Sequence, residues 1–315
     1  MSDDKKIYDY EKAREPLSNA LESARQMSAT MTAVCSRMRQ IFDVVYSQQT
    51  KEMITGIRNT MQAFVDVAAE FKVPEIKIPD ELIYAFHKLS IIMALRKAEW
   101  PLFFYIDENF IDLFDRFVPN GESDSEIIGQ MLMDYIDDSK ISFIRASWKE
   151  SLSIERNAIV DEAIKLYKNE SYYGCVALFS CQIEGIISET YAEQETFGRK
   201  YTLEDLKIGY KCCNQGKNMP ETMKLKKNPT EKQQLLVMLT DVESGAFSFM
   251  AGAEYLYNYI FTSNDLMNDS MHPCRHKICH GTQLNFGTKE HAIKAILAFD
   301  IAVKLSEELK QAQSA

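Results

Sequence analysis

A short segment near the C-terminus, residues 272–281, concentrates side chains that can carry out acid–base chemistry. Together with His291 it holds four of the five histidines of the chain. Histidine titrates near neutral pH and can give or accept a proton, while the guanidinium of Arg275 offers paired donors to phosphate oxygens. Four residues separate Arg275 from His280, and His276 stands one helical turn before His280. In a short helical turn all three side chains can therefore point into one cleft.

The same segment permits two other chemistries. His276 and His280 have a spacing that suits zinc on a helix. Other potential ligands nearby are His272, Cys274 and Cys279. Structural zinc sites usually draw ligands from two separated pairs, and the only other candidate pair, Cys212–Cys213, cannot readily turn two adjacent thiols towards one metal. Cys279 next to His280 could act as a nucleophile, but neighbours on one turn lack the usual attack geometry. We therefore expect no metal site.

Helices predicted before and after this segment in the sequence should hold it in position. Residues 154–190 read as two helices broken at 169–171, and a last amphipathic helix is predicted over 288–309. A further helix is expected over about 231–261. The helix that follows the break at 169–171 carries Glu184 among apolar neighbours. Because an ionised carboxylate is costly to bury alone, Glu184 should reach solvent or face a cation or donor from elsewhere in the fold.

The N-terminal half also has helical periodicity. Apolar residues spaced by three and four over 17–45 and again over 54–71 predict an antiparallel helical hairpin. A coiled-coil seam between two chains is the alternative use of such a stripe. Shorter helices are expected at about 80–100, 107–117, 123–137 and 140–151. The pattern changes near residue 151, which divides the chain into an all-helical N-terminal domain, 1–150, and a C-terminal helical bundle, 151–315.

Composition supports an all-α, cytoplasmic protein. Only 12 Gly and 8 Pro are spread over 315 residues, and 46% of the residues are hydrophobic. No stretch approaches the roughly 20 uncharged apolar residues that span a bilayer, and the N-terminus is polar rather than a signal peptide. We therefore expect no membrane association. The seven cysteines form no evenly spaced framework, so reduced thiols are expected.

The net charge of -10 argues against a surface that is basic throughout. Residues 199–232 are an exception, because they contain nine Lys or Arg against four Asp or Glu. This segment predicts either a basic patch or a solvated, lysine-rich loop.

The sequence RHKICHG at 275–281 resembles the Arg-x4-6-His signature of HEPN domains, the small helical modules of many prokaryotic defence and toxin ribonucleases. As in that family, the motif lies just before a final amphipathic helix. The helix with QIEG at 182–185 and the paired tyrosines Tyr172 and Tyr173 are also similar, so the resemblance covers about 155–310. One position departs: a polar residue, often Asn, commonly follows the arginine, and here it is His276, whose role stays open.

The resemblance implies that two such domains form a homodimer and cut RNA in a composite groove, without a metal or other cofactor. On this interpretation His280 is the general base or acid and Arg275 stabilises the transition state, while His276 orients phosphate or shares proton transfer. Glu184 would hold Arg275 or a histidine in place. The lysines expected to contact RNA are Lys224, Lys226, Lys227 and Lys277.

Two functional classes remain open from the sequence. The first is an endoribonuclease of antiviral defence (abortive infection) or a toxin, with an antitoxin or a phage-derived trigger as partner. The second is a non-catalytic helical module that binds proteins or nucleotides. The sequence contains no Walker loop, dinucleotide-binding glycine fingerprint or nucleophile elbow, which disfavours NTPases, dehydrogenases and ordinary hydrolases.

Overall fold

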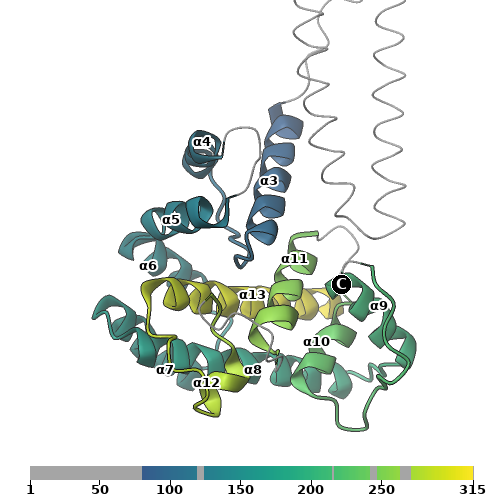
Figure 1. Ribbon diagram of the computed structural model, residues 1–315. Coiled ribbons are helices and arrows are strands. Elements are labelled where there is room, and N and C mark those ends of the chain that lie inside the picture. The colour runs from purple at the N-terminus through teal and green to yellow at the C-terminus, as the bar shows by residue number, and fades with distance from the viewer. Residues whose placement is uncertain (1–79, 119–123, 215, 242–246, 263–270, 315) are drawn as a thin grey trace, which may run out of the picture. The chain divides into compact units, whose positions relative to one another are not determined.

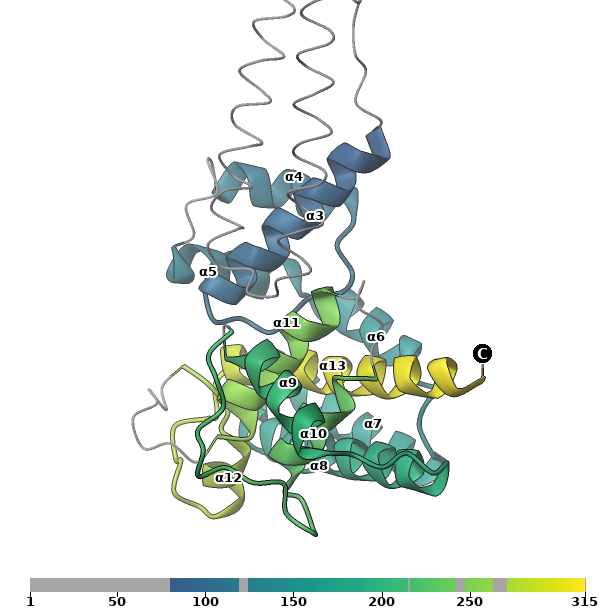
Figure 2. The same ribbon diagram turned by 90° about the vertical axis from the view of Figure 1, so that its right-hand side faces the viewer.

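Every regular element in the described part of the chain is a helix, so the predicted all-α fold class is correct. The computed structural model describes residues 80–118, 124–214, 216–241, 247–262 and 271–314 (Figures 1 and 2). The hairpin predicted for the first seventy residues lies outside these ranges.

The helices differ widely in length, and the two longest are α8 and α13. In chain order they are α3 (Asp80–Lys97), α4 (Glu108–Phe117), α5 (Ser125–Tyr135), α6 (Asp138–Ser147), α7 (Ile154–Lys168), α8 (Tyr172–Thr196), α9 (Leu203–Cys213), α10 (Glu231–Met238), α11 (Phe247–Tyr255), the π-helical turn η2 (Leu256–Ile260), α12 (Arg275–Cys279) and α13 (Lys289–Ser314). Within the described ranges, none of them has the length and apolar character needed to cross a membrane.

Polar side chains determine where several helices begin. Asp107 before α4 and Ser153 before α7 each accept a hydrogen bond from a first-turn amide. Thr202 and Asp205 form a capping box at the start of α9, in which each side chain binds the backbone amide of the other residue. Helix α9 falls inside the basic segment 199–232, so this segment is not a loop throughout.

Helix α13 forms the centre of the described fold. Every residue from His291 to Val303 is buried. Helix α8 packs along α13, and α5 and α11 also contact it. In both views α13 runs between a layer that contains α4, α5 and α6 and a second layer that contains α7 and α8 (Figures 1 and 2). The helix predicted over 288–309 is therefore present, but its middle, from His291 to Val303, is covered on all sides rather than on one apolar face.

Asp300 joins the segment before α7 to this central helix. Its Oδ1 accepts hydrogen bonds from Trp148 Nε1 at 2.7 Å and from the Tyr105 hydroxyl at 2.9 Å. The indole of Trp148 also packs edge-on against Phe299, with ring centroids 4.8 Å apart. Burial raises the pKa of Asp300 to about 6, although both hydrogen-bond donors oppose this change.

The contacts divide the chain into two units, Met1–Phe86 and His87–Ala315. Tyr105 and Trp148, which bind Asp300, thus belong to the same unit as the C-terminal helices. The boundary expected near residue 151 is not confirmed. The boundary is inferred from a change in the sequence pattern, but buried contacts such as those of Tyr105 and Trp148 with Asp300 connect residues 98–150 to α13.

The helix predicted over 231–261 is interrupted after α10. Arg199 gives a physical reason, because its guanidinium pairs with Asp241 Oδ1 at 2.8 Å and with Asp205 Oδ1 at 3.3 Å. These ion pairs hold the chain that follows α10 beside the start of α9.

The replacement Asp300→Asn tests the buried carboxyl group. Between its ordinary pKa of 3.8 and the folded value of about 6, the unfolded chain releases the proton first, so the contribution of Asp300 to stability falls as the pH rises. Asparagine keeps an acceptor without charge. The free energy of unfolding of the variant, relative to wild type, should therefore rise by about 2 kcal/mol between pH 4 and pH 7.

Urea unfolding at the two pH values measures this difference. Asp300→Ala, which removes the acceptor for Trp148 and Tyr105, should destabilise the protein at both. A difference between the Asn variant and wild type that stays constant with pH would contradict the prediction.

Candidate functional site around helix α12

Helix α12 is a short helix that carries the predicted site residues and packs against α8. His280 caps its C-terminus, and the next residue, Gly281, has a φ of 70°. A positive φ favours glycine because other residues clash there, so Gly281 ends the helix at low cost. The short helical turn expected from the sequence is thus present.

His272 anchors the chain before α12 in the core. Its ring stacks on Tyr259 with centroids 4.1 Å apart, and its Nε2 lies 3.2 Å from Glu99 Oε2. The Tyr255 hydroxyl lies 3.3 Å from Nδ1. Burial lowers the pKa of His272, and the Glu99 carboxylate only partly opposes this effect. These contacts give His272 a structural role.

Gln283 connects the chain on the two sides of α12. Its Nε2 donates to the His272 carbonyl at 2.8 Å, and its Oε1 accepts from the Cys274 amide at 3.0 Å. The Cys274 thiol in turn donates to the Thr262 carbonyl at 2.9 Å. Because Gln283 is buried, these bonds are shielded from water and fix both ends of α12.

The turn that follows α12 packs against the start of α8. The Tyr173 hydroxyl donates to the Leu284 carbonyl at 3.2 Å, and its ring meets Phe286 edge-on. A Cβ atom on Gly287 would lie 2.2 Å from the Tyr173 ring, so a larger residue there would displace the ring. Tyr173, one of the paired tyrosines of the sequence pattern, therefore holds the turn in place.

Arg275 turns towards α8 and forms an ion pair with Glu184. Both side chains are mostly buried, with 21% and 25% of their surfaces exposed. The Arg275 Nε is buried and has no hydrogen-bond partner among the described residues. Arg275 is thus the cation that Glu184 faces, and a phosphate would have to share or displace this carboxylate.

His276 and His280 lie together on the exposed side of α12. Their ring centroids are 4.4 Å apart and the rings are inclined by 59°. Both residues are exposed, whereas Arg275 on the same helix is directed to Glu184. The structure therefore brings the two histidines together and gives Arg275 a different immediate partner, an arrangement unlike a single cleft containing all three side chains.

The possible zinc ligands do not gather. Among the described residues, no group of three or more His, Cys, Asp or Glu side chains is placed to hold a metal ion. His272 is buried against Tyr259, and the Cys274 thiol is bonded to a carbonyl. The geometry accordingly gives the zinc alternative no support.

The lysines predicted to contact RNA lie in two places. Lys277 is part of α12, while Lys224, Lys226 and Lys227 are exposed in the connection between α9 and α10. In the described contacts, no hydrogen bond or ion pair joins these three lysines to α12. Their role in RNA binding stays a prediction.

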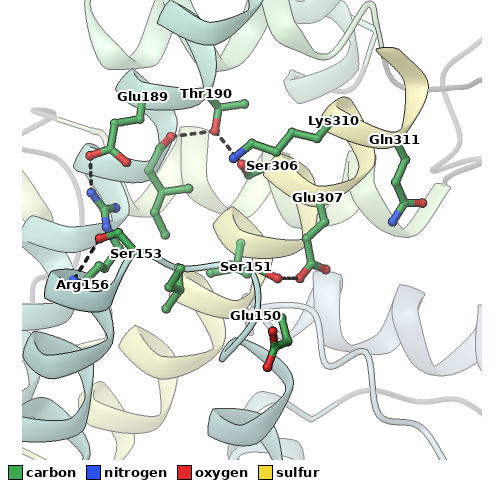
Figure 3. A pocket seen from close by; sticks show the side chains of 13 residues that line it. Glu150, Ser151, Ser153, Arg156, Glu189, Thr190, Ser306, Glu307, Lys310 and Gln311 are labelled. Carbon is green, nitrogen blue, oxygen red and sulfur yellow. Dashed lines mark hydrogen bonds and ion pairs between the residues drawn. The ribbon is translucent and has the colours of Figure 1, made fainter. Parts of the chain in front are cut away.

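A pocket of about 310 Å³ that the sequence did not reveal lies where α7, α8 and α13 meet (Figure 3). Arg156 on its wall pairs with Glu189 and donates to the Gln182 carbonyl at 3.3 Å. Ser151 donates to Glu307 on the opposite wall. These polar groups already bind one another, and α12 does not line the pocket, so it is separate from the histidine pair.

No protein family model matches the chain, and no curated protein or solved structure is significantly similar to it. The resemblance to HEPN domains therefore stays a prediction that rests on the residues described above.

A double-mutant cycle tests the ion pair that holds α12 on α8. Glu184→Gln and Arg275→Gln should each destabilise the protein, and the double variant should lose less than the sum of the two. For a mostly buried pair we expect a coupling energy of about 1–2 kcal/mol in urea unfolding.

The pair Glu204 and Lys207 on α9 is a matched control. Its atoms lie 3.2 Å apart, but 69% and 47% of its side chains are exposed. The same cycle there should give a coupling of about 0.5 kcal/mol or less. A coupling for Glu184 and Arg275 no larger than the control would mean that this pair does not secure α12.

Proposed function

We propose that the protein is a metal-independent endoribonuclease of the HEPN type that acts as a homodimer. The observation that carries the proposal is the exposed pair His276 and His280, with ring centroids 4.4 Å apart, on the short helix that also bears Arg275. The resemblance implies a cytoplasmic role in antiviral defence or as a toxin. An antitoxin or a phage-derived trigger would then control the activity, and the N-terminal region would sense it.

The proposed reaction uses the RNA 2'-hydroxyl as the nucleophile. A base takes the proton from that oxygen, and an acid supplies one to the departing 5'-oxygen. Imidazole performs either task near neutral pH, so His280 is assigned as base or acid and His276 as its assistant. Arg275 would stabilise the charge on the phosphorane oxygens. The products are a 2',3'-cyclic phosphate and a 5'-hydroxyl.

The geometry of the histidine pair favours a site shared by two chains. In-line attack places the nucleophile and the leaving group on opposite sides of the phosphorus. A base and an acid, each about 3 Å from its oxygen, must then be separated by more than about 6 Å. The imidazoles of one chain lie side by side, with centroids 4.4 Å apart, rather than on opposite sides of a phosphate. One α12 therefore supplies one proton carrier, and a second copy supplies the other.

Glu184 has a positioning role in this proposal. It keeps Arg275 beside α8 in the absence of RNA, and it competes with phosphate for the same guanidinium. When RNA binds, the free donors of Arg275 engage the phosphate, or the whole guanidinium leaves Glu184. Glu184 thus fixes the position from which the Arg275 guanidinium moves when phosphate binds.

The same ion pair favours the alternative function. An arginine already neutralised by a carboxylate is typical of a structural contact. On the alternative, α12 belongs to a non-catalytic module that binds proteins or nucleotides. On this alternative, changes to His280 leave RNA intact, and α12 serves as part of a docking surface.

RNA cleavage by purified variants separates the two functions. Wild type should cut RNA in excess EDTA and leave cyclic phosphate ends. His280→Ala should lower the rate by about 100-fold or more because one proton transfer is lost, and Arg275→Ala by a similar factor because charge stabilisation is lost. His276→Ala should have a smaller effect.

Lys149→Ala is the control, because it removes a positive charge at an exposed position in the turn after α6 and leaves α12 unchanged. Circular dichroism should show that all variants keep their helices. Cleavage that persists in both His280→Ala and Arg275→Ala would refute the assignment, and no cleavage by folded, dimeric wild type on varied RNAs would favour the non-catalytic module.

The shared site predicts a stable association of two chains. Sedimentation velocity should show a dimer at the protein concentration at which cleavage is measured, and the rate per chain should fall on dilution below the dissociation constant. A monomer with undiminished activity would contradict the composite site while leaving the assignment of His280 open to the variant test.

A further inference from the structure

Two exposed cysteines meet where α12 packs on α8. The Sγ atoms of Cys181 on α8 and Cys279 at the end of α12 lie 3.7 Å apart. Both residues are exposed, so small oxidants can reach them. The other described cysteines are buried or half-buried: Cys175, Cys212, Cys213 and Cys274.

This distance is close to that of a cross-link. A disulfide has an S–S length of about 2.05 Å, so the two sulfurs need to approach by only about 1.7 Å. Rotation of the two exposed side chains can supply much of this movement while α12 and α8 stay in contact. Bonding would close a large loop, because 98 positions separate the two residues.

We propose that Cys181 and Cys279 form a redox-sensitive dithiol that peroxide converts into an intramolecular disulfide, which locks α12 onto α8. The cross-link itself does not depend on the proposed ribonuclease function. Its effect on activity does, since that part of the inference concerns regulation of the same site.

The reaction balances with hydrogen peroxide as the oxidant. One thiolate attacks a peroxide oxygen, the O–O bond breaks, and a sulfenic acid and one water form. The second thiolate attacks that sulfur, the S–O bond breaks, and a second water leaves with the released protons. Two thiols thus lose two electrons and two protons, and one peroxide becomes two waters.

The order of the two steps follows from the surroundings of the thiols. Partial desolvation of its sulfur, together with the adjacent Cys181 thiol, raises the pKa of Cys279. Cys279 therefore supplies little thiolate at neutral pH, which suits the second, intramolecular step better than the first. Cys181 on the surface of α8 is assigned as the residue that attacks peroxide.

The disulfide would lie directly beside the ion pair of the site. Glu184 follows Cys181 by one turn of α8, and Arg275 precedes Cys279 by one turn of α12. The covalent bond would act in parallel with the ion pair and keep Arg275 at Glu184. It would also restrain His280, the next residue after Cys279. We expect oxidation to switch off RNA cleavage because Arg275 can no longer move to a phosphate.

Peptide mass spectrometry of the full chain tests the cross-link. After treatment with hydrogen peroxide and alkylation of the remaining thiols, a peptide that joins Cys181 to Cys279 should appear and should vanish with dithiothreitol. Cys181→Ser and Cys279→Ser should each abolish it, while Cys212→Ser, the control, should retain it. Hydrogen exchange across residues 274–283 should slow in the oxidised wild type.

Absence of this peptide, or a cross-link between chains on a non-reducing gel in its place, would overturn the proposal. Such a result leaves the ribonuclease assignment untouched if reduced wild type still cuts RNA.

Activity measurements test the regulatory part. Oxidised wild type should lose at least 10-fold in cleavage rate and recover with dithiothreitol, whereas Cys181→Ser should keep its rate after peroxide. Equal rates for oxidised and reduced wild type would refute regulation. If the disulfide forms but neither form cuts RNA, the ribonuclease proposal fails and the cross-link stands.

Discussion

The need to cover α13 governs the described fold. A helix buried at every residue from His291 to Val303 must find neighbours on all sides, and its polar residues must find partners. Asp300 binds Trp148 and Tyr105 on one side, which brings residues 98–150 into the same unit. Lys294 is fully buried, pairs with Glu290, and donates to the Met271 carbonyl at 2.7 Å. This last bond connects the core to the chain just before α12.

From that bond, successive contacts position the candidate site. Met271 precedes His272, whose ring is stacked in the core, and Gln283 then ties the start of α12 to the chain beyond its end. His272 and Gln283 are buried and hydrogen-bonded, so moving α12 would leave polar atoms without partners. These contacts hold α12 in a fixed position, although the helix has too few residues to be stable on its own. His276 and His280 are left exposed to solvent.

Local sequence rules predicted the elements better than their assembly. Apolar spacing located α13, and the pattern around Gly281 located the end of α12, because both depend on neighbouring residues. The capping box of Thr202 and Asp205 would also have revealed α9. The contact of Trp148 with Asp300 spans 152 positions, and local periodicity contains no information about it. The ion pair of Arg199 with Asp241, just after α10, likewise spans 42 positions. For the site, the sequence left Arg275 and a histidine as possible partners of Glu184, and the structure pairs it with Arg275.

The pairing of Arg275 with Glu184 explains how one contact can both organise a site and restrain it. In a chain with a net charge of -10, a phosphate approaching α12 meets an arginine whose charge is already compensated. Binding energy from elsewhere must offset that competition, from the lysines or from a second α12. On the proposed function, a single chain with exposed histidines would be nearly inert, and a second copy would supply the missing proton carrier. On the proposed function, low activity of the isolated chain follows from electrostatics and needs no separate inhibitory segment.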